Sequence, residues 1–329
     1  MKHINVALFV PHLGCSNTCI FCNQKTISGK CGELECREII SSAETAKKTP
    51  HCIHNSEIAF FGGSFTVIER EKMLSYLETA SAYIGKDFGG IRISTRPDAI
   101  DEEILSILKK YGVTSIELGA QSMCDDVLSL NERGHTADDT RKAAKLIKEN
   151  GFSLGLQMMT GLYGSSREKD IYTAGQFVEL KPDTVRIYPT VVLEGTKLAE
   201  YYIQGMYTPE TLEESVELCS LLLELFYENS IKVIRLGLHS GGNVEEGFIA
   251  GVYHPAFGEL CEARMYRNLA LSQLEEMPRG NYTVSVNSRE ISKMTGQKKS
   301  NIEFFREKGY FLKIKGDEEL KEYQIKITI

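Results

Sequence analysis

Three cysteines stand at a spacing that suits metal ligation. Cys15, Cys19 and Cys22 form a C-x3-C-x2-C motif shortly after an apolar run at 4–10. Three thiolates in one tight loop can hold three corners of an iron–sulfur cluster, because soft sulfur ligands suit such centres. A zinc site or buried structural thiols are the alternatives, but structural zinc usually takes two separated ligand pairs and no second C-x2-C occurs. The spacing favours a cluster whose fourth iron is open to a substrate or cofactor.

The other cysteines form no comparable pattern. The sequence has nine cysteines, and five of them lie between Cys15 and Cys36. A disulfide framework is not expected, because cytosolic thiols stay reduced. Cys31, Cys36 and Cys52 could hold a second cluster or a zinc ion, but C-x4-C with a distant third thiol is a poor ligand pattern. We interpret these three as incidental, and we place the remaining cysteines on helix faces.

The elements that must position the cysteines alternate between short apolar runs and segments of helical periodicity. The predicted strands are 4–10, 56–61, 91–94, 115–118, 153–158 and 184–188, and helices are predicted at 69–83, 101–111, 136–150 and 166–180, with Thr136 as an N-cap. This order implies parallel strands joined by right-handed crossovers. The sequence therefore predicts a partial or full (β/α) TIM-type barrel, in which sites lie at the carboxyl ends of the strands.

The cysteine spacing after the first strand resembles that of the radical S-adenosylmethionine (SAM) superfamily. The resemblance implies a 4Fe–4S cluster that reductively cleaves SAM and generates a 5′-deoxyadenosyl radical. Gly62, Gly63 and Ser64 follow the second strand and resemble the glycine motif that meets the methionyl amino group of SAM. Glycine permits such a close approach of the backbone, although a Gly–Gly pair alone equally suits a turn.

Five further phrases resemble the radical-SAM half of the Elongator catalytic subunit. They are ISTRPD (93–98), ELGAQS (117–122), NERGH (131–135), QMMTGLYG (157–164) and IYPTVVLEGTKL (187–198). The resemblance, which extends to oxygen-independent coproporphyrinogen oxidase, implies that Gln121 lies near the nucleoside of SAM and Arg133 near its carboxylate. A solvated surface charge is the alternative for Arg133. Ser94 and Gln157 stand where the oxidase has carboxylates at the SAM ribose. Arg96 and Asp98 suit ligands or a loop salt bridge equally.

This sequence departs from the Elongator subunit in two respects. Its cysteine spacing is much narrower, and it holds no segment long enough for the acetyltransferase domain of that protein. Acetyl transfer is therefore not carried over. His12 and His135 receive no catalytic role, because an isolated histidine is more often structural. The unpatterned run at 235–260 is interpreted either as a closure of the barrel near the substrate or as a packed connector.

Composition and charge point to two unequal parts. The chain has 329 residues and a net charge of −7, yet from Arg279 onward it carries 11 Lys and Arg against 7 Asp and Glu. We predict a radical SAM barrel domain at 1–277, with an extension from about 209, and a small α+β domain at 278–329. No apolar run is long enough to span a membrane and no secretory signal is recognised, so we expect a cytoplasmic protein without a membrane partner.

The basic tail resembles a KH RNA-binding domain. A turn between two predicted helices places Lys293, Gly296, Gln297, Lys298 and Lys299 where the GxxG loop of that family grips a nucleic-acid backbone. Short basic loops with exposed amides suit phosphates. The match is incomplete because Lys299 replaces the second glycine, and a small structural cap is the alternative reading of the tail.

Together these features predict a radical SAM enzyme, either a transferase or an oxidoreductase, that modifies a tRNA or rRNA base. A flavodoxin or ferredoxin would reduce the cluster, and no DNA partner is expected. One alternative retains the cluster and SAM but acts on a porphyrin or other small metabolite. Another is a non-catalytic RNA-binding protein with a structural metal. The positively charged tail favours RNA over a small metabolite.

Overall fold

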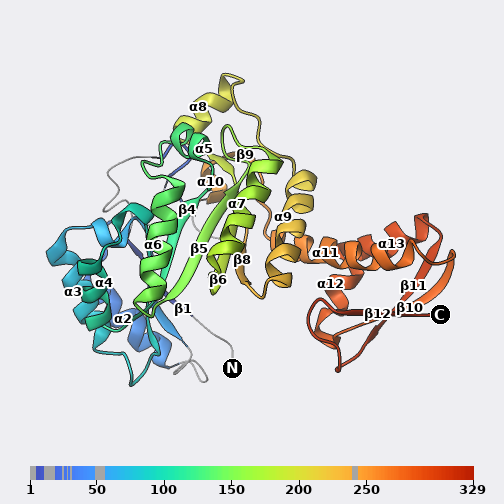
Figure 1. Ribbon diagram of the computed structural model, residues 1–329, viewed down its shortest axis with the longest axis horizontal. Coiled ribbons are helices and arrows are strands. Elements are labelled where there is room, and N and C mark those ends of the chain that lie inside the picture. The colour runs from blue at the N-terminus through green and yellow to red at the C-terminus, as the bar shows by residue number, and fades with distance from the viewer. Residues whose placement is uncertain are drawn as a thin grey trace.

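The fold is built around one curved parallel sheet (Figure 1). The computed structural model describes residues 5–10, 19–23, 26–27, 29, 32–48, 56–238 and 244–329. All neighbouring strands of the main sheet run parallel, in the order β1 (Asn5–Val10), β2 (Glu57–Gly62), β3 (Gly90–Thr95), β4 (Val113–Gln121), β5 (Ser153–Thr160), β6 (Thr184–Pro189) and β8 (Lys232–Leu236). The curled seven-stranded sheet confirms the partial barrel.

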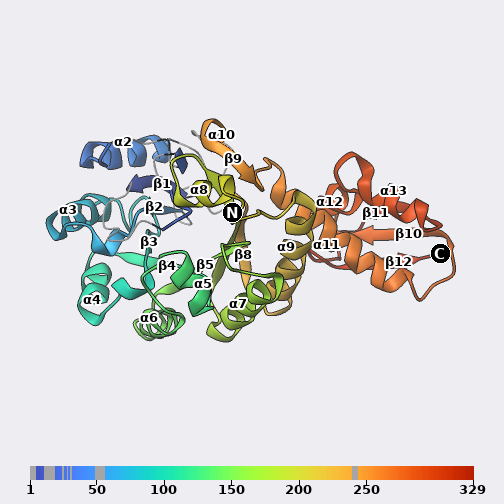
Figure 2. The same cartoon turned by 90° about the horizontal axis from the view of Figure 1, so that it is seen from above.

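Helices cover the outer side of this sheet (Figure 2). They are α2 (Cys36–Lys47), α3 (Arg70–Ser81), α4 (Glu102–Lys110), α6 (Ala137–Glu149), α7 (Arg167–Leu180) and α9 (Leu212–Glu228). Thr136 caps α6 as predicted: its side chain accepts a hydrogen bond from the Asp139 amide, and the Asp139 carboxylate accepts one from the Thr136 amide. The main apolar core lies between the sheet and these helices, with Ile93 and Leu118 fully buried.

Shorter elements occupy the loops at the carboxyl ends of the strands. Two single-turn helices lie at Phe65–Val67 and Pro97–Ala99, and α5 (Asp125–Leu130) and α8 (Lys197–Ile203) follow β4 and β7 (Val191–Leu193). β7 pairs with β9 (Phe248–Gly251), which directly follows α10 (Val244–Gly247). The elements β7, β9 and α10 lie across the open side of the half-barrel (Figure 2). The unpatterned run at 235–260 therefore contributes to the closure of this side, although residues 239–243 lie outside the described part.

A second, smaller layer follows the barrel. It contains α11 (Phe257–Leu274), β10 (Gly280–Val286), α12 (Ile291–Thr295), α13 (Ser300–Glu307), β11 (Tyr310–Gly316) and β12 (Ile325–Thr328), with single turns at Ser288–Glu290 and Gln297–Lys299. The sheet has the order β11-β10-β12, and β10 runs parallel to β11 and antiparallel to β12. This is an α+β domain, as expected; its KH-like assignment stays a prediction.

The second core does not begin at the predicted boundary of 277/278. Its fully buried members include Tyr266, Ala270 and Leu274 from α11, together with Val284 and Phe305 from the tail. The first half of the same helix places Phe257 and Cys261 in the main core. The helix α11 thus belongs to both cores, and the division at 277/278 stays a prediction from composition. None of the helices in the described part of the chain combines the length and apolarity that crossing a membrane requires.

Candidate functional site

A cavity of about 330 Å³ lies inside the half-barrel, toward the carboxyl ends of its strands. Five of the residues predicted to bind the cluster or SAM line it: Cys22, Gly62, Ser94, Gln121 and Gln157. They come from the segment after β1 and from β2, β3, β4 and β5. Parallel strands bring their carboxyl ends to one edge of a sheet, which explains how residues so far apart in the sequence share one cavity.

The two described cysteines of the motif lie at and beside this cavity. Cys22 lines it, and Cys19 is buried. A hydrogen bond from the Cys22 amide to the Cys19 carbonyl closes the turn between them. The Arg133 Nη1 atom donates to the Cys19 sulfur at 2.9 Å. Cys15 lies outside the described residues. Arg133 is thus a buried partner of a predicted cluster ligand and not a solvated surface charge.

The glycine segment plays two different parts. Gly62 has a φ of +111°, and a Cβ there would lie 2.9 Å from the Val10 carbonyl oxygen, so the close approach of β1 and β2 requires glycine. The Gly63 amide donates to the same carbonyl. Ser64 is buried and hydrogen-bonded to the Thr95 hydroxyl and the Arg96 amide, which fixes the turn. Gly62 lines the cavity, whereas Ser64 stabilises the turn beside it.

Two polar side chains of the cavity hold buried atoms without partners. The Ser94 hydroxyl and the Gln121 carbonyl oxygen have no hydrogen-bond partner in the described part of the chain, although Ser94 is only 8% exposed. Gln121 adopts a left-handed φ of 66° at an irregularity in the pairing of β4 with β5. Buried polar atoms are normally satisfied, and their exceptions often mark a site that a ligand completes. These two atoms therefore indicate a polar ligand in the cavity.

A layer of buried charge lies beneath these residues. Glu117, which is 1% exposed, accepts hydrogen bonds from Arg92 Nη1 at 3.0 Å and from Arg186 Nε at 2.7 Å, and it also accepts one from the Gln157 amide. Arg92 in turn bonds Glu57. The carboxylates neutralise the guanidinium groups inside the barrel, where an unpaired charge would be very costly. Gln157, predicted at the ribose, is held in place by this layer.

Two members of this layer have shifted pKa values. Burial raises the pKa of Glu57, but Arg92 and the hydroxyls of Ser115 and Thr114 outweigh that effect and leave the pKa below its ordinary value. For Arg186, burial alone would lower the pKa, but the Glu117 carboxylate more than offsets this effect, so the pKa is raised overall. The Glu57 carboxylate and the Arg186 guanidinium are therefore both charged near pH 7.

Sequence reasoning missed several cavity residues. Arg186, Tyr188 and Arg235 line the cavity from β6 and β8. The Arg186 guanidinium lies over the Phe61 ring, 5.0 Å from its centroid, and Arg235 Nε donates to the Gly237 carbonyl. A signal was present, because Thr184, Arg186 and Tyr188 alternate with apolar residues along a parallel strand that would otherwise be apolar on both faces.

Two other candidates, Arg96 and His135, contact neighbouring groups of the protein. Arg96 makes a bidentate ion pair with Asp98, at 2.9 and 2.7 Å. This pair favours the interpretation of the two residues as a loop salt bridge over their interpretation as ligands. Burial, followed by the nearby Arg133 charge, lowers the pKa of His135 to about 4. His135 is therefore neutral near pH 7, and its Nε2 atom lies 3.2 Å from the Ala120 carbonyl oxygen.

The residues of the predicted RNA-binding turn have different surroundings in the structure. Lys293 is half-buried and pairs with Glu262 and Glu290, each at 2.9 Å. Burial lowers its pKa, but these two carboxylates outweigh that effect and raise it overall, so Lys293 is a structural cation. Gln297, Lys298 and Lys299 are exposed. Gly296 has a φ of +78°, and a Cβ there would lie 2.5 Å from the Ser300 hydroxyl, which explains the glycine at this turn.

Known protein families match most of the barrel. A family model described as the radical SAM superfamily matches residues 9–174, and a second, described as the radical SAM C-terminal domain, matches residues 182–267. The first match runs from the end of β1 to the middle of α7 and thus includes most of the strands that line the cavity. The second covers β6, β8 and α9 and ends within α11.

Relatives resemble the same part of the chain. The tRNA uridine(34) acetyltransferase of Methanocaldococcus jannaschii is 32% identical over 198 residues, which cover 54% of this chain and 37% of that protein. The human Elongator complex protein 3 is 30% identical over 203 residues, or 55% of this chain and 37% of that protein. The structure of Methanocaldococcus infernus Elp3 with an N-terminal deletion superimposes with a TM-score of 0.65 at 24% identity, covering 84% of this chain and 64% of that one. The chain spans less than two fifths of the first two proteins.

Proposed function

We propose that this chain, which belongs to the radical SAM superfamily, binds a 4Fe–4S cluster and SAM in the half-barrel cavity and uses them to modify an RNA base. The observation that carries the proposal is the convergence of Cys22, Gly62, Ser94, Gln121 and Gln157 on one cavity. The unpartnered Ser94 and Gln121 oxygens support it, because a polar cofactor would satisfy both.

The residues present fit both groups. Cys15, Cys19 and Cys22 would hold three irons, and Arg133, which donates to the Cys19 sulfur, would keep that sulfur in position. The Gly62 backbone would lie against SAM, Ser94 and Gln157 would face its ribose and Gln121 its nucleoside. When bound, the reduced cluster and SAM supply a carbon-centred radical that abstracts hydrogen, and the protein orients the reactants.

The walls of the cavity suit radical chemistry. Phe9, Phe61 and Met159 give it an apolar lining, which limits the access of water to reactive species. The Arg186 guanidinium is fixed between Glu117 and the Phe61 ring, so its charge is neutralised and its position is rigid. Such a buried ion pair shapes the cavity without adding net charge to it.

An RNA substrate is supported by the names of the relatives and by the tail. Relatives that match the barrel are tRNA-modifying or Elongator proteins by name, and the exposed Lys298 and Lys299 add positive charge at the α12–α13 turn together with Gly296 and Gln297. Acetyl transfer is left out of the proposal. The electron donor would be a flavodoxin or ferredoxin.

Anaerobic reconstitution tests the proposal. The chain is loaded with iron and sulfide, reduced with dithionite and incubated with SAM, and methionine and 5′-deoxyadenosine are quantified. We expect cleavage by the wild-type chain and its loss in Cys22→Ser. Cys36→Ser is the matched control, because Cys36 lies outside the motif and contacts Ser75. An iron-loaded protein that leaves SAM intact would refute the enzyme and favour a non-catalytic RNA-binding protein.

The RNA part has its own test. Nucleosides from tRNA and rRNA of a deletion strain are compared with those of the parent strain by mass spectrometry. We expect one modified nucleoside to disappear and to return when the wild-type gene, but not the Cys22→Ser gene, is restored. If every nucleoside persists while SAM cleavage is intact, the substrate is a small metabolite instead.

A further inference from the structure

One face of the C-terminal sheet is left uncovered. Alternate residues of each strand point to opposite faces. Tyr282, Val284 and Val286 of β10 pack into the second core, which α11, α12 and α13 all join from that side. The opposite face, called here the outer sheet face, consists of Asn281, Thr283, Ser285, Phe311, Lys313, Lys315, Lys326 and Thr328. Figure 1 shows the helices of this domain on one side of β10, β11 and β12.

The outer sheet face carries positive charge without counter-charge. Its three lysines are exposed, and none of them makes an ion pair within the described part of the chain. No Asp or Glu occupies an outward position on the three strands. Lys313 and Lys315 stand about 6.6 Å apart along β11, as residues two positions apart on a strand do. The register places Lys315 and Lys326 on either side of Ser285.

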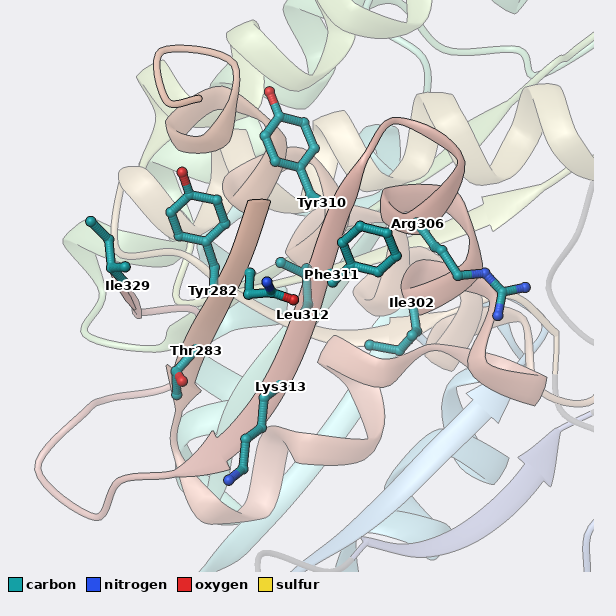
Figure 3. A pocket seen from close by; sticks show the side chains of 10 residues that line it. Tyr282, Thr283, Ile302, Arg306, Tyr310, Phe311, Leu312, Lys313 and Ile329 are labelled. Carbon is teal, nitrogen blue, oxygen red and sulfur yellow. The ribbon is translucent and has the colours of Figure 1, made fainter. Parts of the chain in front are cut away.

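An aromatic side chain stands beside these lysines. Phe311 is 54% exposed, and the register places it next to Asn281 on β10. It lines a shallow depression of about 460 Å³ that Arg306, Ile302, Lys313 and Thr283 also border (Figure 3). An exposed aromatic ring on a strand, flanked by cations, is the arrangement on which unpaired nucleic-acid bases stack.

Hydroxyl and amide groups complete the surface. Thr283 and Thr328 are paired across β10 and β12, and Ser285 and Asn281 lie on the same face. These groups can exchange hydrogen bonds with ribose and base edges, whereas binding to a bilayer depends on a larger apolar surface that enters it. One exposed ring with a row of polar groups therefore fits a nucleic acid better than a membrane.

We infer that the outer sheet face binds single-stranded RNA, with Phe311 stacking on a base and Lys313, Lys315 and Lys326 contacting phosphates. The inference rests on the proposed function for its choice of RNA. A single strand is favoured over a duplex, because the bases of a duplex are already stacked on one another and present no free ring face. The surface lies on different elements from the α12–α13 turn, so it is a separate site from the predicted KH-like loop.

Equilibrium binding to the full-length chain tests this inference. The probe is a fluorescein-labelled single-stranded RNA of about twelve nucleotides, within the usual span of small sheet domains. We expect Phe311→Ala to raise its Kd roughly tenfold and Phe311→Trp to retain binding, since a larger ring still stacks. Lys313→Gln, Lys315→Gln and Lys326→Gln together should reduce the slope of log Kd against log salt by about two.

Matched variants separate the competing outcomes. Lys86→Gln, Lys142→Gln and Lys145→Gln remove three exposed lysines of the barrel and should leave the salt slope unchanged. The inference is wrong if only Lys298→Gln with Lys299→Gln weakens binding, if duplex RNA competes as well as the single strand, or if the sheet variants lose binding to phosphatidylserine vesicles and not to RNA. SAM cleavage by the wild-type chain, measured without RNA, tests the proposed function separately.

Discussion

Inside the half-barrel Arg92 and Arg186 share the Glu117 carboxylate, whereas on the outer sheet face Lys313 and Lys315 have no acidic neighbour on their strands. The first pair of cations is buried and the second is exposed to water. A buried charge must be neutralised by the protein itself, while an exposed charge is solvated and remains available to a ligand. The comparison teaches that positive charge is used up inside the protein in one region and stays exposed in the other, where the proposed RNA would contact it.

The largest effect is expected from breaking the buried layer. Glu117→Gln leaves Arg186 without a counter-charge in the barrel and removes one of the two carboxylates that Arg92 contacts, so the free energy of unfolding should fall by about 3–5 kcal/mol. Urea denaturation measures the change. Glu303→Gln is the control, because Glu303 pairs with Arg306 at the surface and its loss should cost about 1 kcal/mol or less. Equal losses in both variants would remove the contrast between the two regions.

Acid should destabilise the barrel through His135. Burial holds the pKa of this histidine at about 4, below its ordinary 6.5, so the folded state favours the neutral ring. This contribution is present above pH 6.5 and is lost as the pH falls toward 4, at a cost of about 3 kcal/mol when complete. Urea denaturation between these pH values should show a weaker dependence in His135→Gln. Gln204→Asn, which alters an uncharged side chain at the end of α8, should keep the wild-type dependence.

A smaller effect is expected on the affinity for SAM. Gln121→Asn shortens the side chain while it keeps a residue type that tolerates the left-handed backbone. The loss of one hydrogen bond to the cofactor should raise the Kd for SAM about tenfold in the reconstituted protein, as isothermal titration would show. Gln204→Asn, on the exposed end of α8, serves as the control. An unchanged Kd would place SAM away from the unpartnered Gln121 oxygen.

The smallest effect should come from the outer sheet face. Replacing Lys313, Lys315 and Lys326 by Gln should change the free energy of unfolding by only about 0.5 kcal/mol, because exposed side chains without partners contribute little to stability. Urea denaturation of the variant used for RNA binding measures this directly. A large loss would show that these lysines hold the sheet together and would weaken the contrast with the barrel.

The parallel strands could be predicted from the sequence, because apolar runs at regular intervals carry a strong periodic signal. The predicted strand at 184–188, for example, nearly coincides with β6. β7, β9, α5 and α8 were not predicted, since elements of three to seven residues give too few periods to recognise. The positions of β7 and β9 depend on packing across the open side of the barrel, which the local sequence does not encode.

The cavity was predictable where a residue followed its strand directly. Gln121 was placed in this way, whereas Ser94, the last residue of a predicted strand, was taken from a family resemblance. Arg186 was not, because its partner Glu117 lies 69 positions earlier and only the register of β4, β5 and β6 brings them together. Lys293 shows the opposite case: its charge was visible in the sequence, but the carboxylates of Glu262 and Glu290 that neutralise it come from another helix and from the turn before its own.

The shared helix α11 fixes the distance between the two regions. Its first half packs with the barrel and its second half with the tail, and the Tyr227 hydroxyl adds a tether to the Glu322 carbonyl at 2.8 Å. A helix of 18 residues measures about 27 Å, and each inserted residue would turn the tail by about 100°. The helix therefore sets a fixed spacing, and if the proposed RNA binds the outer sheet face, only a nucleotide at a set number of positions along the strand would reach the barrel.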